Sequence, residues 1–355
     1  MKTICDFQDK KILIVGGAGF VGSNLVHQLL EQDPGEIIVV DNLLSSDVSN
    51  IPADSRVRFV FGSITEDKIL AALPEDLDFA FHLACYHGNQ SSIANPLADH
   101  ENNTLTSLKL FERLKDFKQL KKVVYAAAAC AVAEKTQNAP TATTEEQPIT
   151  LYHDSPYSIS KIIGELYGNY YFQRHQLPFV KARFSNVYGP REILGAGLWR
   201  GTVHTVWRNV IPTFVWRALN GDALPLDNGG NTSRDFIFVE DMARGLMACA
   251  LKGTVGEVYN LATGRETSIL ELATLINEYT GNQSGLDLRP ARDWDRSGKR
   301  FASTEKAEKD LGVASQVDIR EGIRRTVKWT RANAELIKYS IAKHDKMMAQ
   351  VGGSA

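Results

Sequence analysis

The segment Tyr157-Ser158-Ile159-Ser160-Lys161 places a phenol and an ammonium group four residues apart. On a helix this spacing brings both side chains to one face, one turn apart. A nearby cation stabilises a phenolate, so Tyr157 could remove a proton from an alcohol while a hydride leaves the same carbon. Such a pair alone is usually only part of a helix surface. Its catalytic interpretation requires a bound hydride acceptor nearby.

A glycine pattern near the start of the chain supplies a site for such an acceptor. Gly16-Gly17-Ala18-Gly19-Phe20-Val21-Gly22 follows the strand-like run Lys11–Val15 and precedes the helical stretch Ser23–Leu30. Glycines at this spacing permit a tight turn and let backbone N–H groups approach a pyrophosphate at the helix N-terminus. The sequence therefore predicts a dinucleotide site.

Asp41 selects between the two nicotinamide dinucleotides. It ends the next strand-like run, Glu36–Asp41, where a carboxylate can accept hydrogen bonds from the adenosine ribose diol and repel a 2′-phosphate. We therefore expect NAD rather than NADP; the alternative is that Asp41 is only a turn residue before Asn42. The residues predicted to bind NAD are Gly16, Gly19, Phe20, Val21, Gly22, Asp41, Asn42, Ser63, Ile64, Leu83, Ala84, Tyr157 and Lys161.

Short apolar runs alternate with helical stretches along the first half of the chain, which predicts an α/β fold with a doubly wound parallel sheet. Further runs are Val57–Phe61, Phe79–Leu83, Val123–Ala127 and Phe179–Phe184, with helical stretches at Leu97–Lys115 and Tyr157–His175. The rhythm changes after Asn186, where Gly, Trp, Pro and Arg are frequent. We expect a dinucleotide-binding domain (1–184, with 235–263 returning to it), a smaller α/β substrate-binding lobe (185–234 and 264–330) and a C-terminal helical tail (331–355).

Composition narrows the possible partners. The chain has 40 basic and 42 acidic side chains, a formal net charge of −2, so nothing favours nucleic acid or an anionic membrane. The N-terminus lacks an apolar signal segment, and the longest apolar run, Val123–Ala133, is too short to span a bilayer, so we expect a cytoplasmic protein. Four cysteines without a CxxC pair indicate neither a zinc site nor a disulfide framework, although a single thiol could be catalytic.

Taken together, these motifs resemble the extended short-chain dehydrogenase/reductase family, in particular its nucleotide-sugar epimerases and dehydratases, over roughly residues 11–330. Within this family, the sequence most resembles epimerases of bacterial lipopolysaccharide O-antigen clusters. The pieces that carry it are Gly16–Gly22, Asp41, His82–Ala84, Asn103, Tyr157/Lys161, Arg183–Pro190 and Thr232–Phe236. The resemblance implies an NAD-binding Rossmann domain, a sugar-nucleotide lobe and a homodimer built on a four-helix interface. It also implies that Asn186 contacts the sugar or diphosphate, and that Arg234 and Arg292 pair with the diphosphate.

One segment departs from the family pattern. Relatives have a Ser or Thr that hydrogen-bonds the substrate hydroxyl, whereas this chain has Ala126-Ala127-Ala128-Ala129-Cys130, with Ala128 at the corresponding substrate-binding place. Either Tyr157 acts unaided, water substitutes, or the protein is impaired or a variant. The dehydratases of the family resemble Thr-Asp-Glu here and its decarboxylases Thr-Ser-Glu, so Ala129 and Cys130 argue against both reactions.

Cys130 leaves two interpretations open. Nucleotide-sugar 3,5-epimerases resemble Ser-Ala-Cys at this place and use the cysteine as an acid/base, which makes Cys130 a catalytic candidate; alternatively it only packs as a small apolar residue. Their partner base lies in a Trp-Lys-Gly segment, where this chain has Trp199-Arg200-Gly201. Arginine stays charged and is a poor acid or base, so the second base is unassigned.

The sequence thus predicts an NAD-dependent isomerase, an epimerase that acts on a nucleotide-diphosphate sugar through a transient 4-keto intermediate in cell-surface polysaccharide biosynthesis. The alternatives are a dehydratase or decarboxylase of the same family, and a catalytically weak protein that binds NAD or a nucleotide sugar. No metal is expected. The retained pair Tyr157 and Lys161 favours an enzyme, because a binding protein does not need it.

Overall fold

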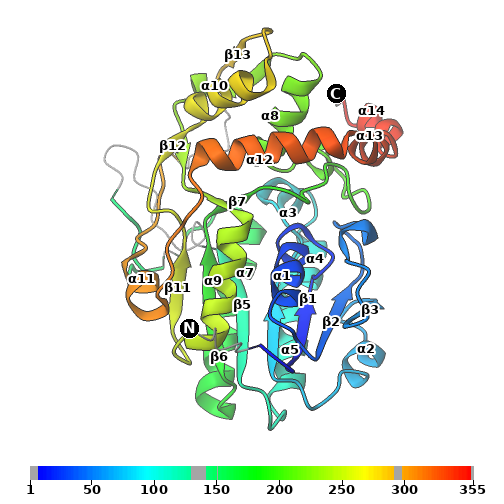
Figure 1. Cartoon of the computed structure of the whole chain (residues 1–355), viewed down its shortest axis with the longest axis vertical. Coiled ribbons are helices and arrows are strands. Elements are labelled where there is room, and N and C mark those ends of the chain that lie inside the picture. Colours follow the sequence, from blue (N-terminus) through cyan, green and yellow to red (C-terminus); the bar gives the residue numbers. More distant parts are fainter. Residues whose placement is uncertain (1–6, 129–140, 150, 292–297, 353–355) are drawn as a thin grey trace.

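The structure is a computed structural model that describes residues 7–128, 141–149, 151–291 and 298–352 of the 355-residue chain. Its centre is a seven-stranded parallel sheet in the order β3-β2-β1-β4-β5-β6-β11 (Figure 1). The strands are β1 (Lys11–Val15), β2 (Glu36–Asp41), β3 (Val57–Phe61), β4 (Phe79–His82), β5 (Lys122–Ala128), β6 (Phe179–Phe184) and β11 (Val258–Leu261). The predicted doubly wound α/β fold is confirmed.

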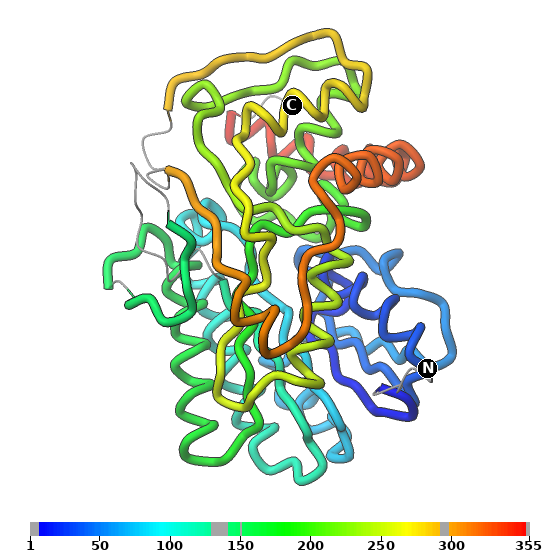
Figure 2. Tube along the Cα trace, turned by 60° about the vertical axis from the view of Figure 1, so that its left-hand side comes forward, coloured from blue at the N-terminus to red at the C-terminus, as the bar shows by residue number. Residues whose placement is uncertain are grey.

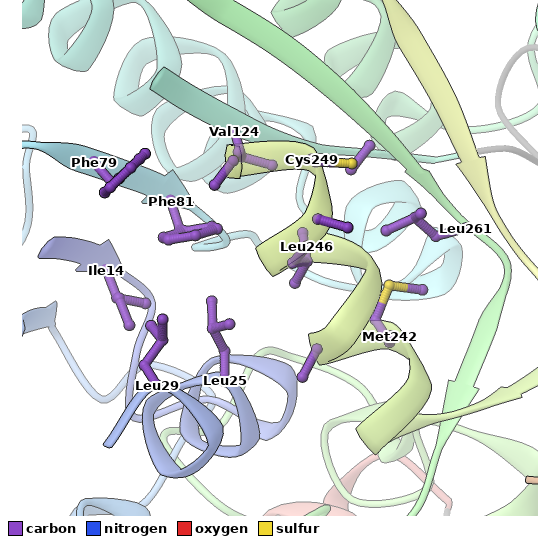
Figure 3. Close-up of a cluster of buried hydrophobic side chains, with 14 of the residues drawn as sticks. Ile14, Leu25, Leu29, Phe79, Phe81, Val124, Met242, Leu246, Cys249 and Leu261 are labelled. Carbon is purple, nitrogen blue, oxygen red and sulfur yellow. The ribbon is translucent and has the colours of Figure 1, made fainter. Parts of the chain in front are cut away.

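Helices cover both faces of this sheet. One face carries α1 (Phe20–Leu30), α9 (Val239–Lys252) and α11 (Glu305–Leu311), and the other carries α2 (Asp67–Ala71), α5 (Thr106–Leu114) and α7 (Pro156–His175). Because successive strand residues point to opposite faces, Ile14 packs against Leu25 and Leu29 of α1, near Leu246 of α9 (Figure 3). Its neighbour Leu13 belongs to the core on the other face. A strand buried on both faces explains the unbroken apolar run in the sequence.

Two glycines bring helix α7 unusually close to the sheet. A Cβ on Gly164 would lie 2.0 Å from the hydroxyl of Tyr125, and one on Gly168 would lie 1.9 Å from the ring of Phe179. Only glycine fits at this separation, so the helix backbone packs directly on β5 and β6. This close packing fixes the face of α7 that carries the Tyr/Lys pair.

A second, smaller lobe lies beyond the carboxyl ends of the strands (Figure 1). It contains α8 (Val210–Leu219), α10 (Ile269–Thr280), α12 (Ile319–Ala332) and three strand pairs, β7 (Asn186–Tyr188) with β10 (Phe236–Phe238), β8 (Leu224–Asp227) with β13 (Leu286–Arg289), and β9 (Ser233–Arg234) with β12 (Thr267–Ser268). Figure 2 shows green, yellow and orange segments in both lobes, so the chain passes between them repeatedly.

The C-terminal helices support one long connection. Helices α13 (Ala334–Ala342) and α14 (Asp345–Gln350) pack against residues 193–207, between β7 and α8. Nε2 of His344 lies 2.9 Å from the carbonyl oxygen of Gly195. Gly195 has φ +72°, and a Cβ there would lie 2.4 Å from the carbonyl oxygen of Ser340. The connection is therefore held closely against these two helices.

Two predicted elements differ in the structure. The stretch Leu97–Lys115 is not one α-helix: α4 (Pro96–Asp99) is followed by the π-helical η2 (His100–Leu105) and then by α5. Hydroxyl and amide side chains in η2 and at the start of α5 bond to backbone carbonyls one turn earlier and compete with regular helix bonds. The segment 235–263 is predicted to return to the large sheet. Its helix α9 packs on that sheet and its strand β11 belongs to it, whereas its first strand, β10, pairs with β7.

Candidate active site

A cavity of about 740 Å³ lies between the carboxyl ends of the sheet strands and the second lobe. Every predicted site residue that the structure describes lines it: Gly16, Gly19, Phe20, Val21, Gly22, Asp41, Asn42, Ser63, Ile64, Leu83, Ala84, Ala128, Tyr157, Lys161, Asn186 and Arg234. Cys130 and Arg292 lie outside the described residues. The fold thus brings residues that are far apart in the sequence to one place.

The turn between β1 and α1 has the shape that a pyrophosphate requires. Gly16 has φ +86°, and a Cβ there would lie 2.5 Å from the backbone nitrogen of Ala84. A Cβ on Gly22 would lie 2.2 Å from the carbonyl oxygen of Gly16. Helix α1 begins after Gly19, whose position carries no side-chain cap. No side-chain cap therefore occupies the first N–H groups of α1, so they are available to the pyrophosphate of a dinucleotide.

Asp41 is both a turn residue and a possible ribose ligand. Its Oδ2 accepts a hydrogen bond from the Ala18 N–H at 3.0 Å, and its Oδ1 accepts from the Leu43 N–H at 2.8 Å and the Ser46 hydroxyl at 2.9 Å. Burial raises the pKa of Asp41, and these hydrogen bonds oppose the rise. The Gly19 N–H also interacts with this carboxylate. Because a carboxylate offers about four acceptor positions, a ribose hydroxyl would share them with the turn.

The Tyr/Lys pair sits at the start of α7, where Ser155 caps the helix and Pro156 occupies its first turn. Nζ of Lys161 donates to the carbonyl oxygen of Ala126 at 2.8 Å and lies 5.8 Å from the ring centroid of Tyr157. Lys161 is buried. The ammonium is thus fixed beside the phenol in a site partly shielded from water, where its charge acts strongly.

The position opposite the phenol carries no hydroxyl. Ala128 is the last residue of β5, is buried, lines the cavity and packs with Tyr157. The ring of His87 also contacts that of Tyr157 edge-on, with 5.9 Å between centroids. Burial, and then the charges of Arg200, Arg208 and Lys161, lower the pKa of His87 to about 3, so the imidazole is neutral at pH 7. Sequence reasoning missed His87.

Two residues of the family motifs, His82 and Asn103, do not line the cavity and bond to neighbouring parts of the fold instead. His82 is buried, with its Nε2 3.0 Å from the Ser107 hydroxyl, and it does not line the cavity. Asn103 accepts a hydrogen bond from the Tyr86 N–H at 2.7 Å and donates one to Asp99 at 2.7 Å. Asn103 therefore ties the loop after β4 to η2 and holds that cavity wall.

The second lobe contributes polar side chains at the far side of the cavity. Asn186 begins β7, and Arg234 of β9 donates to the carbonyl oxygens of Ser233 at 2.7 Å and Gly298 at 2.8 Å. Arg289 and Arg300 line the same cavity. Guanidinium groups are well suited to a diphosphate.

The connection between β7 and α8 adds side chains that the sequence did not single out. Those lining the cavity include Glu192, His204, Arg208, Asn209 and Arg217. Burial raises the pKa of Glu192 to about 7 and lowers that of Arg208 to about 9. The connection has little periodicity, so its density of Arg and Trp was the only available signal.

Fold and site together define the class: an α/β protein of the short-chain dehydrogenase/reductase type, with a glycine turn and a Tyr/Lys pair on one cavity. Residues 12–262 match the NAD dependent epimerase/dehydratase family. The chain belongs to this family, which confirms the resemblance found in the sequence. The family is NAD dependent, in agreement with the predicted cofactor.

Three relatives illustrate the range of the family. The Bordetella bronchiseptica enzyme WbmF, crystallised with NAD+ and UDP, is 57% identical, with 98% of this chain and 99% of that chain covered and a TM-score of 0.89. Epimerase Mth375 from Methanothermobacter thermautotrophicus is 38% identical, with 95% and 96% covered and a TM-score of 0.87. A dTDP-glucose 4,6-dehydratase from Streptomyces antibioticus is 30% identical over 91% of this chain and 92% of its own length. The relatives therefore include both epimerases and dehydratases.

Two negative observations concern the described residues only. Within residues 7–128, 141–149, 151–291 and 298–352, no helix combines the length and apolar character needed to cross a membrane. In the same part of the chain, no three His, Cys, Asp or Glu side chains are grouped so that they could hold a metal ion.

Proposed function

We propose that this protein is an NAD-dependent epimerase that inverts a carbon of a nucleotide-diphosphate sugar through a transient 4-keto intermediate. We further propose that it acts in the cytoplasm, in cell-surface polysaccharide biosynthesis. The observation that carries the proposal is the shared cavity: the glycine turn, the Tyr157/Lys161 pair and the arginines of the second lobe all line it. This arrangement accommodates a dinucleotide and a second diphosphate ligand on either side of one phenol.

The chain's own residues account for the proton transfers. Tyr157 takes the proton of the sugar hydroxyl, and the buried ammonium of Lys161, held by the Ala126 carbonyl, stabilises the resulting phenolate. When bound, NAD would supply a reversible acceptor for the hydride of the same sugar carbon. The proton returns from Tyr157 to the alkoxide, so the cycle consumes no oxidant or reductant. Inversion at C4 requires only that the ketone present its other face before the hydride returns, whereas inversion at C3 or C5 also requires deprotonation of that carbon.

The residue types at positions 128–130 support an epimerase over a dehydratase or decarboxylase. Ala128 is buried and has no functional group in its side chain, and Ala129 and Cys130 follow it in the sequence. At these positions the dehydratases resemble Thr-Asp-Glu and the decarboxylases Thr-Ser-Glu, both of which contain acidic residues. The other alternative, a weak ligand-binding protein, is disfavoured by the buried and oriented Lys161. A protein that only binds its ligands does not need a lysine buried beside a phenol.

The proposal is tested by incubating the NAD-loaded protein with UDP-, GDP-, CDP- and dTDP-sugars, including uronic acids, in deuterated water. Product is analysed by mass spectrometry and NMR, with Tyr157→Phe as the inactive control. We expect an epimer without net NADH. Deuterium in the ring that Cys130→Ser suppresses would assign inversion at C3 or C5 to the thiol; an unlabelled epimer would assign inversion at C4 and leave Cys130 as a packing residue. A 4-keto-6-deoxy or decarboxylated product would contradict the proposal.

We also propose a homodimer that pairs α7 and the helices preceding β5 with their symmetry mates. Apolar side chains are exposed on these elements: Ile93, Leu97, Ile159, Leu166 and Tyr170. Burying such a patch against its own copy satisfies the closed symmetry usual for soluble oligomers. Light scattering at micromolar concentration should give twice the mass of the 39.3 kDa chain. A monomer would contradict this part of the proposal.

A further inference from the structure

Two arginines lie close enough to His87, the neighbour of Tyr157, for their charges to lower its pKa, and neither has a carboxylate partner among the described residues. Arg200 and Arg208 belong to the connection between β7 and α8, and both contact Thr205: the Arg200 N–H donates to its hydroxyl at 3.0 Å, and Nε of Arg208 donates to its carbonyl oxygen at 2.8 Å. Within the described part of the chain, neither arginine forms an ion pair. Arg200 is buried and Arg208 is half-buried. Because arginine is rarely removed from water without a charged partner, both side chains require an explanation.

Arg200 is connected to Tyr157 through His87. Its side chain lies over the ring of Tyr86, and Nη1 donates to the carbonyl oxygen of His87 at 2.8 Å. Only 4% of the residue is exposed, and its Nε and Nη2 have no partner among the described residues. His87 thus contacts the guanidinium of Arg200 through its carbonyl oxygen and the phenol of Tyr157 through its ring.

Arg208 lines the cavity itself and is held only by neutral groups. Besides Thr205, its guanidinium donates to the carbonyl oxygens of Ser45, at 2.7 Å, and Ala196. A guanidinium has five N–H groups, so two remain. These bonds fix its position but are made to neutral groups, so a negative charge can offset its own only through space, as that of Glu192 does in part.

Among the described residues, Glu192 is the carboxyl whose charge acts on Arg208, and it neutralises this charge only in part. Glu192 also lines the cavity, but it accepts a hydrogen bond from Asn209 and its Oε2 has no partner in the described chain. Burial raises its pKa to about 7, so it carries only part of a negative charge at neutral pH. Lys161 adds a further cation beside Tyr157. The tyrosine end of the cavity is therefore electropositive and would be stabilised by an anion.

We propose that the sugar of the substrate carries a carboxylate, as a hexuronic acid does, and that Arg208 is the specificity-determining residue that receives it. His87, whose ring nitrogens make no hydrogen bond to a described residue, and Arg200 behind it support the same carboxylate. This inference rests on the proposed function, because it concerns the sugar that Tyr157 oxidises. The substrate diphosphate is assigned to a different group of arginines, which includes Arg234 of the second lobe.

The test compares matched pairs of substrates that differ only at C6: UDP-glucuronic acid with UDP-glucose, and the corresponding N-acetylated pair. Binding to the NAD-loaded Tyr157→Phe protein is measured by calorimetry, and turnover is measured with the unmodified protein. We expect the uronate of at least one pair to bind and react about 10- to 100-fold better than its neutral partner, the scale of charge-assisted hydrogen bonds.

Arg208→Gln, which keeps donors but removes the charge, should reduce this preference to within about threefold, and Arg208→Lys should retain part of it. The matched control is Arg320→Gln, because Arg320 lies in an exposed ion pair with Glu278, away from the cavity. UDP alone serves as a probe for the diphosphate. An equal loss of UDP affinity in Arg208→Gln would place Arg208 at the diphosphate and overturn the inference.

The outcomes separate this inference from the proposed function. Epimerisation of neutral sugars as efficient as that of uronates would overturn the carboxylate and leave the epimerase intact. Tighter binding of the uronate without turnover would support the carboxylate and count against the epimerase. Equal binding of both members of each pair overturns the inference even if Arg208→Gln fails to fold, because that comparison needs no substitution at Arg208.

Discussion

Replacing Lys161 with methionine tests the electrostatic part of the site most quantitatively. The ammonium lies 5.8 Å from the ring centroid of Tyr157 and is buried. At an effective dielectric constant of about 20, a unit charge at that distance stabilises a phenolate by about 3 kcal/mol. Losing this stabilisation should lower the rate by about 100-fold. Methionine is similar in length, so the helix should pack as before.

The assay is single-turnover formation of NADH from bound NAD and substrate, followed by absorbance between about pH 7 and 9.5. The deficit of Lys161→Met should shrink as the pH rises, because hydroxide can then generate the phenolate without a neighbouring cation. The matched control is Lys122→Met: Lys122 also lies near the sheet and donates to a backbone carbonyl, that of Gly253, but does not line the cavity. A Lys161→Met rate within about threefold of the unmodified protein would refute the electrostatic reasoning.

Three further substitutions test other parts of the site. Tyr157→Phe should lower turnover by about 10²- to 10⁴-fold and leave NAD affinity unchanged, as measured by steady-state kinetics and calorimetry; near-normal turnover would place the base elsewhere. Gly22→Ala should weaken NAD binding far more than Gly19→Ala, because the added Cβ would lie 2.2 Å from the Gly16 carbonyl oxygen in the first case and 3.1 Å in the second; equal affinities would contradict the role of the turn. Burial lowers the pKa of His82 from 6.5 to about 3, so the unfolded chain binds its proton first and stability falls as the pH drops below about 6.5. His82→Leu should therefore reduce the loss of unfolding free energy between pH 7 and 5 by up to about 2 kcal/mol, measured by urea titration; identical losses would contradict a neutral buried His82.

The sequence predicted the parts of the site that depend on local geometry. The glycines between β1 and α1 and the acidic residue at the end of β2 are detectable because a turn and a strand end restrict the residue type at each position. The four-residue spacing of Tyr157 and Lys161 is a property of one helix. Asp41 shows the limit of this reasoning, because its carboxylate also caps its own turn, which spacing alone does not reveal.

The remaining part of the site depends on contacts between distant segments. His87 follows β4 without any regular pattern. Its ring contacts Tyr157, and hydrogen bonds to Asn103 and from Arg200 hold its loop. Arg208 faces the cavity because the connection that carries it packs against helices at the C-terminus. The break at η2 was missed for a related reason: side-chain bonds to the backbone altered a helix whose apolar pattern is continuous.

The most direct test of the central claim is NMR analysis of a nucleotide sugar before and after incubation with the NAD-loaded protein, with NADH followed in the same sample. An epimerase predicts an equilibrium mixture of two stereoisomers, the same mixture when the reaction starts from either one, no net NADH, and no mixture with Tyr157→Phe. A stable keto product, or a sugar that remains unchanged across the panel while NAD and the nucleotide sugar both bind, would contradict the account.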